Sequence, residues 1–447
     1  MKVTRRSLLI AALVLLAVLV GMVVWMALKP SEVERHLARL RAEGIPTTPL
    51  ELDAWYAAVP DAENAGALFL EAASGFRTVS APGLELEFTR RLSLTNVPSD
   101  EVQVLNRAYL ATNAGTLAAI HAALQHPHSR YPVDFRGGVH TQLPHLDALK
   151  TNAEQLGVCA EIAAESGEPE LATRCLLDSM RLARTLEQEP MLISFLVATV
   201  CDAIAVTSTA RVLRHVALSE DELVSLQRAL GESAARLTYG RAMMGEVCMT
   251  RDALRNPAQV LFKSPWPTGS SRPGFDIQEI GLWLYSAIGV KSRDLSVMVD
   301  YYDRSRICAA LSPTQRRLET QTLNAEVTRR LASEFLPLAR MMLPALFQVE
   351  TKATRQASRL RCAEVACAVQ RWRLAHAGAL PPSLDALVPE LLTSVPEDPM
   401  DGRPLRFRAL AKGFVVYSVG EDGLDDGGTV HLPGVSKRWD DTFVVER

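Results

Sequence analysis

Apolar residues follow three successive patterns along the chain. Residues 8–28 (LLIAALVLLAVLVGMVVWMAL) carry no charge and match the ~20 residues that a helix needs to cross a bilayer. Between about residues 31 and 350, apolar positions recur at the spacing of amphipathic helices. Beyond residue 350 they form one more helix and then short runs rich in Val, Phe and Tyr, which favour strands. The pattern predicts a mainly α-helical protein with an N-terminal transmembrane helix, an irregular domain of solenoid-like helical hairpins, and a small C-terminal α+β unit.

Capping signals predict several helix ends. Residues 31–34 and 219–222 have the S-x-x-E spacing of a capping box, in which the two side chains bind each other's backbone N–H groups. Thr48 precedes a proline that can occupy the first helical position. Residues 165–169 predict a tight turn between helices, and the Pro-, Gly- and Ser-rich stretch 264–275 predicts a loop.

The predicted C-terminal unit begins with a helix from about residue 351 to 377, which ends at Gly378. Strands are predicted at residues 405–408, 414–419 and 442–445. We therefore divide the chain into three parts. These are a cytoplasmic tip with the anchor (1–30), an extracytoplasmic helical domain (31–350) and the α+β unit (351–447).

The flanks of the first apolar run predict the topology. Lys2, Arg5 and Arg6 precede the run, and basic residues favour the cytoplasmic side. A cleaved signal peptide is the alternative, but Trp25 lies two residues before Ala27, where a small residue is needed for cleavage. We expect a single-pass protein of the cell (inner) membrane, with its C-terminal bulk outside the cytoplasm.

A second apolar run, residues 191–210, is a possible second membrane span. Asp202 lies near its middle, and a mid-bilayer aspartate costs about 2.5–3.5 kcal/mol on insertion scales. We therefore favour the alternative, a helix that is apolar nearly all round because it is buried inside a bundle.

Composition excludes some classes of partner and motif. A net charge of −3 gives no general attraction to nucleic acid or to an anionic surface. The arginines of residues 355–373 are expected on a solvated helix face, some of them paired with carboxylates, and not on a nucleic acid. The 7 cysteines contain no C-x-x-C pair. Cys159 and Cys175 lie at equal distances from Gly167, so they either form a disulfide across a helical hairpin or, as we expect, fill the seam as reduced thiols.

Four C-terminal segments together carry a family resemblance. They are RWRLAHAG (371–378), LPPSLDALVPE (380–390), VPEDPMDGRPLRFR (395–408) and FVVYSVGEDGLDDGG (414–428). As a set they resemble the globular part of the major pseudopilin of type II secretion, a type IV pilin-like protein. The likeness implies a long helix packed on a short sheet and a calcium-binding loop after the second strand. Phe407 stands where the family commonly has tyrosine, and the membrane run lacks the family's G-F-T-L-x-E start.

The resemblance assigns the calcium site to Asp422, Asp425 and Asp426, with backbone carbonyls near Ser418 and Val419. Glu421 belongs to the same acidic stretch, whose glycines allow tight folding. Calcium prefers six to eight oxygen ligands at about 2.3–2.6 Å, which carboxylates and carbonyls can supply. The alternative is an acidic, solvated turn, and the sequence leaves the two interpretations equal.

The helical domain offers weaker candidates. Two segments, RYPVDF…LPHL (130–146) and EQEPMLIS (187–194), resemble segments of a group of bacterial membrane-anchored helical proteins. This likeness implies no activity. Five histidines crowd one stretch but lack the ligand spacing of a metal site. Four acidic residues are candidate acid–base groups if they share a groove, although we expect them to be solvated. The histidines are His121, His126, His128, His140 and His145, and the acids are Glu161, Glu165, Asp178 and Asp202.

No nucleophile elbow, Walker loop or dinucleotide-binding glycine motif is found in the sequence. We therefore favour a non-enzymatic, membrane-anchored scaffold or binding protein of the bacterial cell envelope. Its partners would be the lipid bilayer, through residues 8–28, and a protein or peptide. The alternative is an envelope hydrolase with its site in the helical domain.

Overall fold

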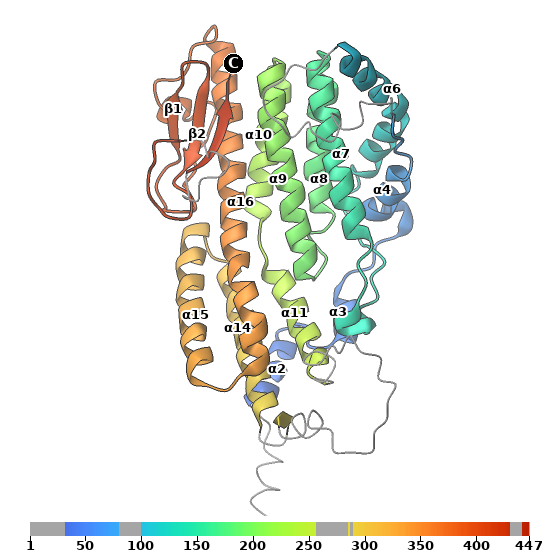
Figure 1. Cartoon of the computed structure of the whole chain (residues 1–447), viewed down its shortest axis with the longest axis vertical. Coiled ribbons are helices and arrows are strands. Elements are labelled where there is room, and N and C mark those ends of the chain that lie inside the picture. Colours follow the sequence, from blue (N-terminus) through green and yellow to red (C-terminus); the bar gives the residue numbers. More distant parts are fainter. Residues whose placement is uncertain (1–31, 80–99, 256–284, 287–288, 430–439, 447) are drawn as a thin grey trace, which may run out of the picture.

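The computed structural model describes residues 32–79, 100–255, 285–286, 289–429 and 440–446. The predicted transmembrane helix, the predicted N-cap Ser31 and the predicted loop 264–275 lie outside the described residues. Within them the protein is mainly helical and carries a three-stranded antiparallel sheet near the C-terminus, as the sequence predicts (Figure 1).

The described elements follow one another along the chain. The α-helices are α2 (Glu32–Ala42), α3 (Pro49–Trp55), α4 (Ala65–Ala73), α6 (Asp100–Ala123), α7 (His145–Glu165), α8 (Pro169–Arg184), α9 (Leu192–His215), α10 (Glu220–Arg236), α11 (Gly240–Ala253), α14 (Val290–Ala309), α15 (Pro313–Ser333) and α16 (Pro337–Ala375). Short 3-10 turns are η1 (Asp61–Glu63), η2 (Phe135–His140) and η3 (Leu384–Leu387), and the strands are β1 (Arg406–Ala409), β2 (Phe414–Ser418) and β3 (Asp441–Val445).

Local chemistry sets several helix ends as predicted. Ser219 and Glu222 form the expected capping box at the start of α10. The Thr48 side chain accepts the N–H of Glu51 at the start of α3, where Pro49 is the first helical residue. Gly167 has a φ of 75° in the turn between α7 and α8. These ends follow from residues within one turn of the helix, so the sequence could predict them.

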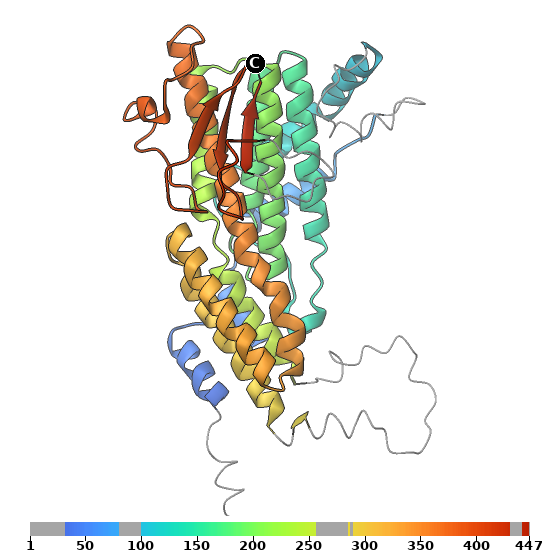
Figure 2. The same ribbon diagram turned by 60° about the vertical axis from the view of Figure 1, so that its left-hand side comes forward.

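The helices form two packed groups along the long axis of the molecule (Figures 1 and 2). In the upper group of Figure 1, helices α4 and α6 to α10 share one hydrophobic core with the C-terminal sheet and the second half of α16. In the lower group, α2, α11, α14 and α15 share a second core with the first half of α16. Helix α16 therefore contributes to both cores.

Helix α16 begins earlier than the sequence predicts. It starts at Pro337 instead of near residue 351, and it contains Pro344. Its first N–H groups, those of Leu338 and Ala339, donate to the fully buried carboxylate of Asp294 on α14 at 3.2 and 3.0 Å. The cap thus comes from a different helix. Consequently, the predicted domain boundary at 350/351 falls inside one continuous helix.

The sheet has the order β1-β2-β3, with both neighbouring pairs antiparallel. The central strand β2 is buried along its whole length and, with β3, packs against α16. In register, Phe407 faces Val416 and Val416 faces Phe443. The strands begin and end within about one residue of the predicted positions, because Val, Phe and Tyr mark them clearly.

The second apolar run forms α9, which packs against α7, α8 and α16. By length and composition it is the one described helix that could cross a membrane. Half of its most apolar stretch is buried inside the protein. This agrees with a bundle helix, but the expectation that it is buried nearly all round is wrong. Ile193 and Val200 on its outer face are 48% and 41% exposed.

The two cysteines of the α7–α8 hairpin have the reduced state that we expect. Cys159 and Cys175 are buried free thiols of the α7–α8 hairpin. Burial raises the pKa of the Cys159 thiol to about 12, so the thiolate that disulfide exchange needs is disfavoured there.

Candidate functional site

The predicted calcium loop follows the C-terminal end of the central strand β2. Gly420, Gly423, Gly427 and Gly428 all have positive φ, between 69° and 70°. At Gly428 a Cβ atom would lie 2.8 Å from a ring carbon of Tyr417, so a side chain does not fit there. Glycine adopts this conformation without strain, so these residues give the loop the tight path that the sequence predicts.

Each predicted ligand has a different place in the loop. Asp422 accepts the N–H of Leu424 at 3.1 Å. Asp425 accepts the N–H of Gly427 at 2.9 Å and lies 3.3 Å from Nε of Arg406 on β1. The backbone N–H of Asp426 donates to Asp440 at 3.3 Å. The carboxylate of Asp425 therefore contacts β1 and the backbone of Asp426 contacts Asp440, whereas Asp422 bonds within the loop itself.

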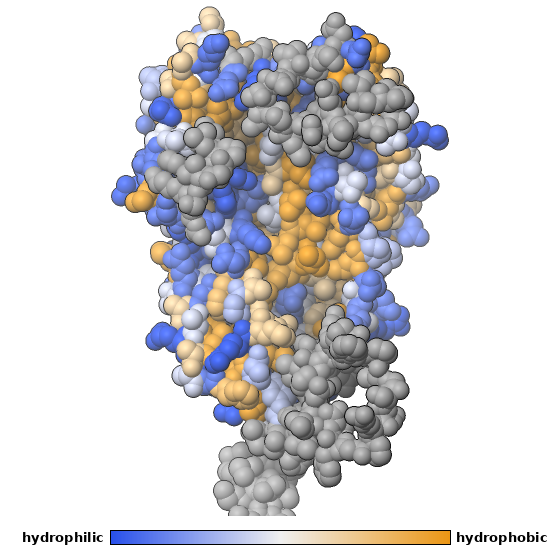
Figure 3. Space-filling model, viewed as in Figure 1, coloured by the Kyte–Doolittle hydropathy of each residue, from blue (hydrophilic) through white to orange (hydrophobic). Residues whose placement is uncertain are grey.

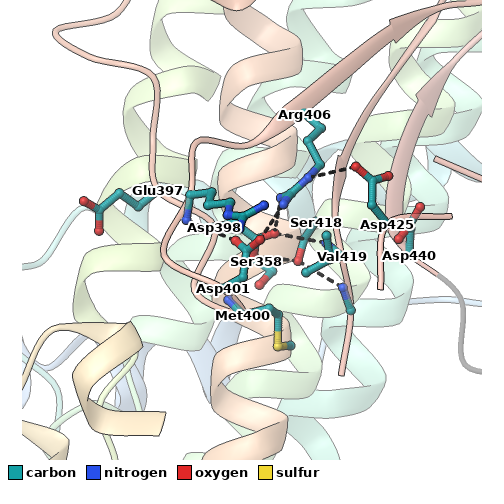
Figure 4. A network of polar contacts seen from close by, with 12 residues as sticks. Ser358, Glu397, Asp398, Met400, Asp401, Arg406, Ser418, Val419, Asp425 and Asp440 are labelled. Atoms are coloured by element: carbon teal, nitrogen blue, oxygen red, sulfur yellow. Dashed lines mark hydrogen bonds and ion pairs between the residues drawn. The ribbon is translucent and has the colours of Figure 1, made fainter. Parts of the chain in front are cut away.

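A buried carboxylate, that of Asp398, accepts hydrogen bonds from the residues at the start of this loop (Figure 4). It is fully buried and accepts hydrogen bonds from Ser418 Oγ at 2.7 Å and from the Val419 N–H at 3.0 Å. Nη1 of Arg406 lies 2.9 Å from the same carboxylate. Arg406 also pairs with Asp401 and with Asp425, so one guanidinium joins three carboxylates.

Asp440, which the sequence analysis missed, closes the loop from the other side. Its Oδ2 accepts the N–H of Gly428 at 2.7 Å, and its Oδ1 accepts that of Asp426. Burial raises the pKa of the Asp440 carboxyl, and the nearby charges of Asp425 and Asp426 raise it further, while the two N–H groups lower it. The only sequence feature that marks this residue is the pair Asp440–Asp441 just before the predicted strand 442–445. Nothing in the sequence shows that this pair lies against the loop.

Among the residues that the structure describes, no group of three or more His, Cys, Asp or Glu side chains is placed to hold a metal ion. Arg406 already supplies positive charge to Asp425. The assignment of calcium to Asp422, Asp425 and Asp426 therefore stays a prediction.

The crowded histidines separate into different surroundings. His121 on α6 pairs with Asp178 on α8, with 3.1 Å between Nδ1 and each carboxylate oxygen. His145 is buried and pairs with Glu189 at 3.0 Å. His140 is exposed in η2. His121 therefore joins α6 to α8 through a carboxylate, and His145 joins the start of α7 to the segment between α8 and α9.

Three of the four candidate carboxylates are buried, which contradicts the expectation that they are solvated. Glu161 accepts Ser208 Oγ at 3.0 Å and pairs with Arg211 at 2.8 Å. Asp178 pairs with His121 and Arg181, and burial raises its pKa. Burial also raises the pKa of Asp202 to about 7, which the positive charges of Arg184 and Arg236 only partly oppose. Glu165 alone of the four is exposed.

A buried Ser–Glu–His group lies near Asp202. Ser194 Oγ donates to Glu189 at 2.5 Å, and Glu189 in turn pairs with His145. In a serine hydrolase the hydroxyl bonds to the imidazole, and the carboxylate lies behind the imidazole. Here the carboxylate separates the other two groups. The neighbouring cavity, lined by Glu189, Asp202 and Arg241, has a volume of only about 60 Å³, whereas ligand sites usually measure about 300–1,000 Å³.

An apolar stripe runs along the outside of α9. Figure 3 shows a hydrophobic patch over this helix in the middle of the molecule. Its members recur at the three- and four-residue spacing of a single helix face, and we call this set the α9 stripe. It consists of Ile193, Leu196, Val197, Val200, Ala203 and Ile204, all of them exposed or half-buried.

Comparison of the chain with protein-family models, with curated proteins and with solved structures found no match. The pseudopilin resemblance therefore rests on the quoted segments alone.

Proposed function

We propose that this chain is a membrane-anchored binding protein of the bacterial cell envelope that engages a protein partner through the α9 stripe. Residues 8–28 would hold it in the inner membrane, and the residues after the anchor would lie outside the cytoplasm. The observation that carries the proposal is the continuous apolar face of α9, since contiguous apolar patches on folded proteins mark interaction sites.

The geometry of the stripe suits a protein segment. Apolar side chains at successive helical turns form a ridge that can pack into the groove of a second helix. The stripe is backed by a rigid bundle, because α9 packs against α7, α8 and α16. A preorganised surface binds with a smaller loss of conformational entropy.

The hydrolase alternative receives less support. A serine hydrolase needs the hydroxyl on an imidazole that a carboxylate orients, and Ser194 donates to Glu189 and not to His145. The hydrolase would also need a larger opening than the cavity beside Glu189. We therefore propose binding in preference to hydrolysis.

The test uses two valines of similar exposure. Val200 lies in the α9 stripe and is 41% exposed, and Val224 lies on α10 and is 39% exposed. A photoreactive residue at position 200 should cross-link one defined protein in intact cells, and the same residue at 224 should not. A charge introduced within the stripe by the substitution I193D should abolish the cross-link from position 200, while the protein keeps its melting midpoint. Equal cross-linking from both positions would refute the proposal.

The proposed location has its own test. An alkaline phosphatase fused to the C-terminus should be active, because that enzyme matures outside the cytoplasm. A fluorescent reporter that requires the cytoplasm should stay dark in the same position. The reverse result would place the C-terminus in the cytoplasm and refute the proposed topology.

A further inference from the structure

A pocket of about 600 Å³ opens where α10 ends and α11 begins, next to the ends of α3 and α14. This is the junction between the two hydrophobic cores. Its volume lies in the range of about 300–1,000 Å³ that is usual for small-molecule sites. Much of its wall is apolar and comes from Ile45, Trp55, Leu237, Met244, Leu311 and Pro313.

All the charged residues that line this pocket in the described part of the chain are arginines. Among the described residues, no aspartate or glutamate lines the pocket. The four side chains come from four different helices, so they are far apart in the sequence. They are Arg241 on α11, Arg306 on α14, Arg316 on α15 and Arg361 on α16.

Arg316 is the least solvated of the four, at 4% exposure. Its Nη1 donates to the carbonyl oxygen of Leu237 at 3.2 Å. Its buried Nε has no hydrogen-bond partner among the described residues. A buried guanidinium with one backbone carbonyl as hydrogen-bond partner leaves most of its donors unused, which is costly in a protein interior. The buried Glu350, whose pKa burial raises, is near enough for the charge of Arg316 to oppose this shift, but the two side chains form no ion pair in the described structure.

Arg241 and Arg361 also lack a carboxylate partner at ion-pair distance in the described structure. Arg241 lies over the Trp55 ring at 3.8 Å and donates to the Gln188 carbonyl at 2.7 Å. Arg361 donates to the Glu397 carbonyl at 2.5 Å. Burial lowers the pKa of both guanidinium groups, and at Arg361 the nearby charges of Glu364 and Glu397 partly oppose this shift. Arg306 differs, because Asp303 lies 2.7 Å from it.

We propose that this pocket binds a small organic anion. A carboxylate or phosphate group would lie among Arg241, Arg316 and Arg361, and an apolar portion would pack against the pocket's aliphatic wall. Planar guanidinium groups are well suited to both kinds of oxyanion. The bound anion would supply the negative charge that the lining lacks. This site is separate from the α9 stripe, so either proposal can fail without the other.

The binding test uses the full chain in nanodiscs of zwitterionic lipid. Equilibrium dialysis would measure the uptake of radiolabelled hexyl phosphate, hexanoate and hexanol, with empty nanodiscs subtracted. We expect saturable binding of at least one of the two anions and none of hexanol. The better anion identifies the head group. Saturable binding of hexanol as strong as that of the anions, or no saturable binding of either anion, would overturn the proposal.

Two pairs of variants locate the binding. Ala235 lines the pocket and is exposed, so it tolerates a longer side chain. A235E should weaken anion binding about tenfold by charge repulsion relative to the neutral, similarly sized A235Q. R316Q should also weaken binding about tenfold, whereas R329Q, at an exposed position of the same helix, should not.

The melting midpoint separates a binding role of Arg316 from a structural one. If the charge serves a ligand, R316Q without ligand should melt no lower than the unchanged protein, because a buried charge that forms no ion pair in the described structure has been removed. If A235E and A235Q bind the anion equally, and R316Q matches R329Q, the anion does not occupy this pocket and the proposal is wrong.

Discussion

Asp202 is a titratable group buried in the upper core, and its pKa of about 7 lies far above the ordinary value of 3.8. Between these two pH values the folded chain holds a proton that the unfolded chain has lost. The contribution of Asp202 to the free energy of unfolding should therefore be most favourable below about pH 4. It should become less favourable as the pH rises toward 7. Glu246, whose pKa burial also raises to about 7, acts in the same direction.

The substitution D202N tests this pH dependence. At pH 8 it should stabilise the protein by roughly 2 kcal/mol, because the buried negative charge is gone. At pH 5 the gain should be clearly smaller, because the folded chain still holds the proton. The measurement is the melting midpoint of the full chain at both pH values, with the exposed Glu319 changed to Gln as control. A midpoint of D202N that falls with pH as steeply as that of the unchanged protein would contradict the assignment.

The candidate carboxylates show how far residue-level prediction could reach. Sequence spacing identified Glu161, Asp178 and Asp202 as a group but gave them the wrong environment. Glu161 is stabilised by Arg211 and Asp178 by His121, both on other helices. Burial of a charge depends on partners that the fold brings together, and these partners have no fixed spacing in the sequence.

At the scale of elements, two helical glycines have opposite surroundings. At Gly245 on α11 a Cβ atom would lie 1.6 Å from the Pro190 carbonyl oxygen, and at Gly115 on α6 nothing lies within 4 Å. G245A should force α11 away from the segment before α9 and lower stability by about 2 kcal/mol or more. G115A should be neutral or stabilise by up to about 1 kcal/mol, since alanine favours helix. Thermal melting of both variants checks this, and equal midpoints would contradict the close approach at Gly245.

The loop after β2 carries the calcium prediction. Clustered carboxylates at Asp425, Asp426 and Asp440 should repel one another less when a cation is bound. At 100 times its dissociation constant, calcium should stabilise the full chain by about 2.7 kcal/mol. D425N should remove this effect, whereas D385N at an exposed position of η3 should keep it. If the melting midpoint is the same in millimolar calcium and in chelator, the loop is an acidic turn.

Helix ends divide into those that the sequence could predict and those that it could not. The start of α10 depends on Ser219 and Glu222, which lie within one turn of each other. The start of α16 depends on Asp294, which belongs to α14 and caps it from the side. Strand positions were predictable because they follow residue type. The arginine-lined pocket was not, because its four arginines come from four helices.

At the scale of the whole molecule, α16 connects the two cores without interruption. Ala353 and Ala357 belong to the lower core, and Leu360 begins a buried run in the upper core. The turn-to-turn phase of this helix therefore determines whether both groups of helices can pack at once. A flexible hinge at 350/351 would let the two halves of α16 rotate independently. The continuous helix and a hinge therefore predict different effects of a change in helix phase.

Inserting one alanine between Glu350 and Thr351 distinguishes the two. Each added residue rotates the rest of an α-helix by about 100° and advances it by about 1.5 Å. The upper half of α16 would then present the wrong face to its core, and the melting midpoint should fall sharply or the chain should fail to fold. The same insertion between Gly378 and Ala379, both of them exposed, should leave the midpoint nearly unchanged. Equal tolerance of both insertions would mean that residues 31–350 and 351–447 pack independently.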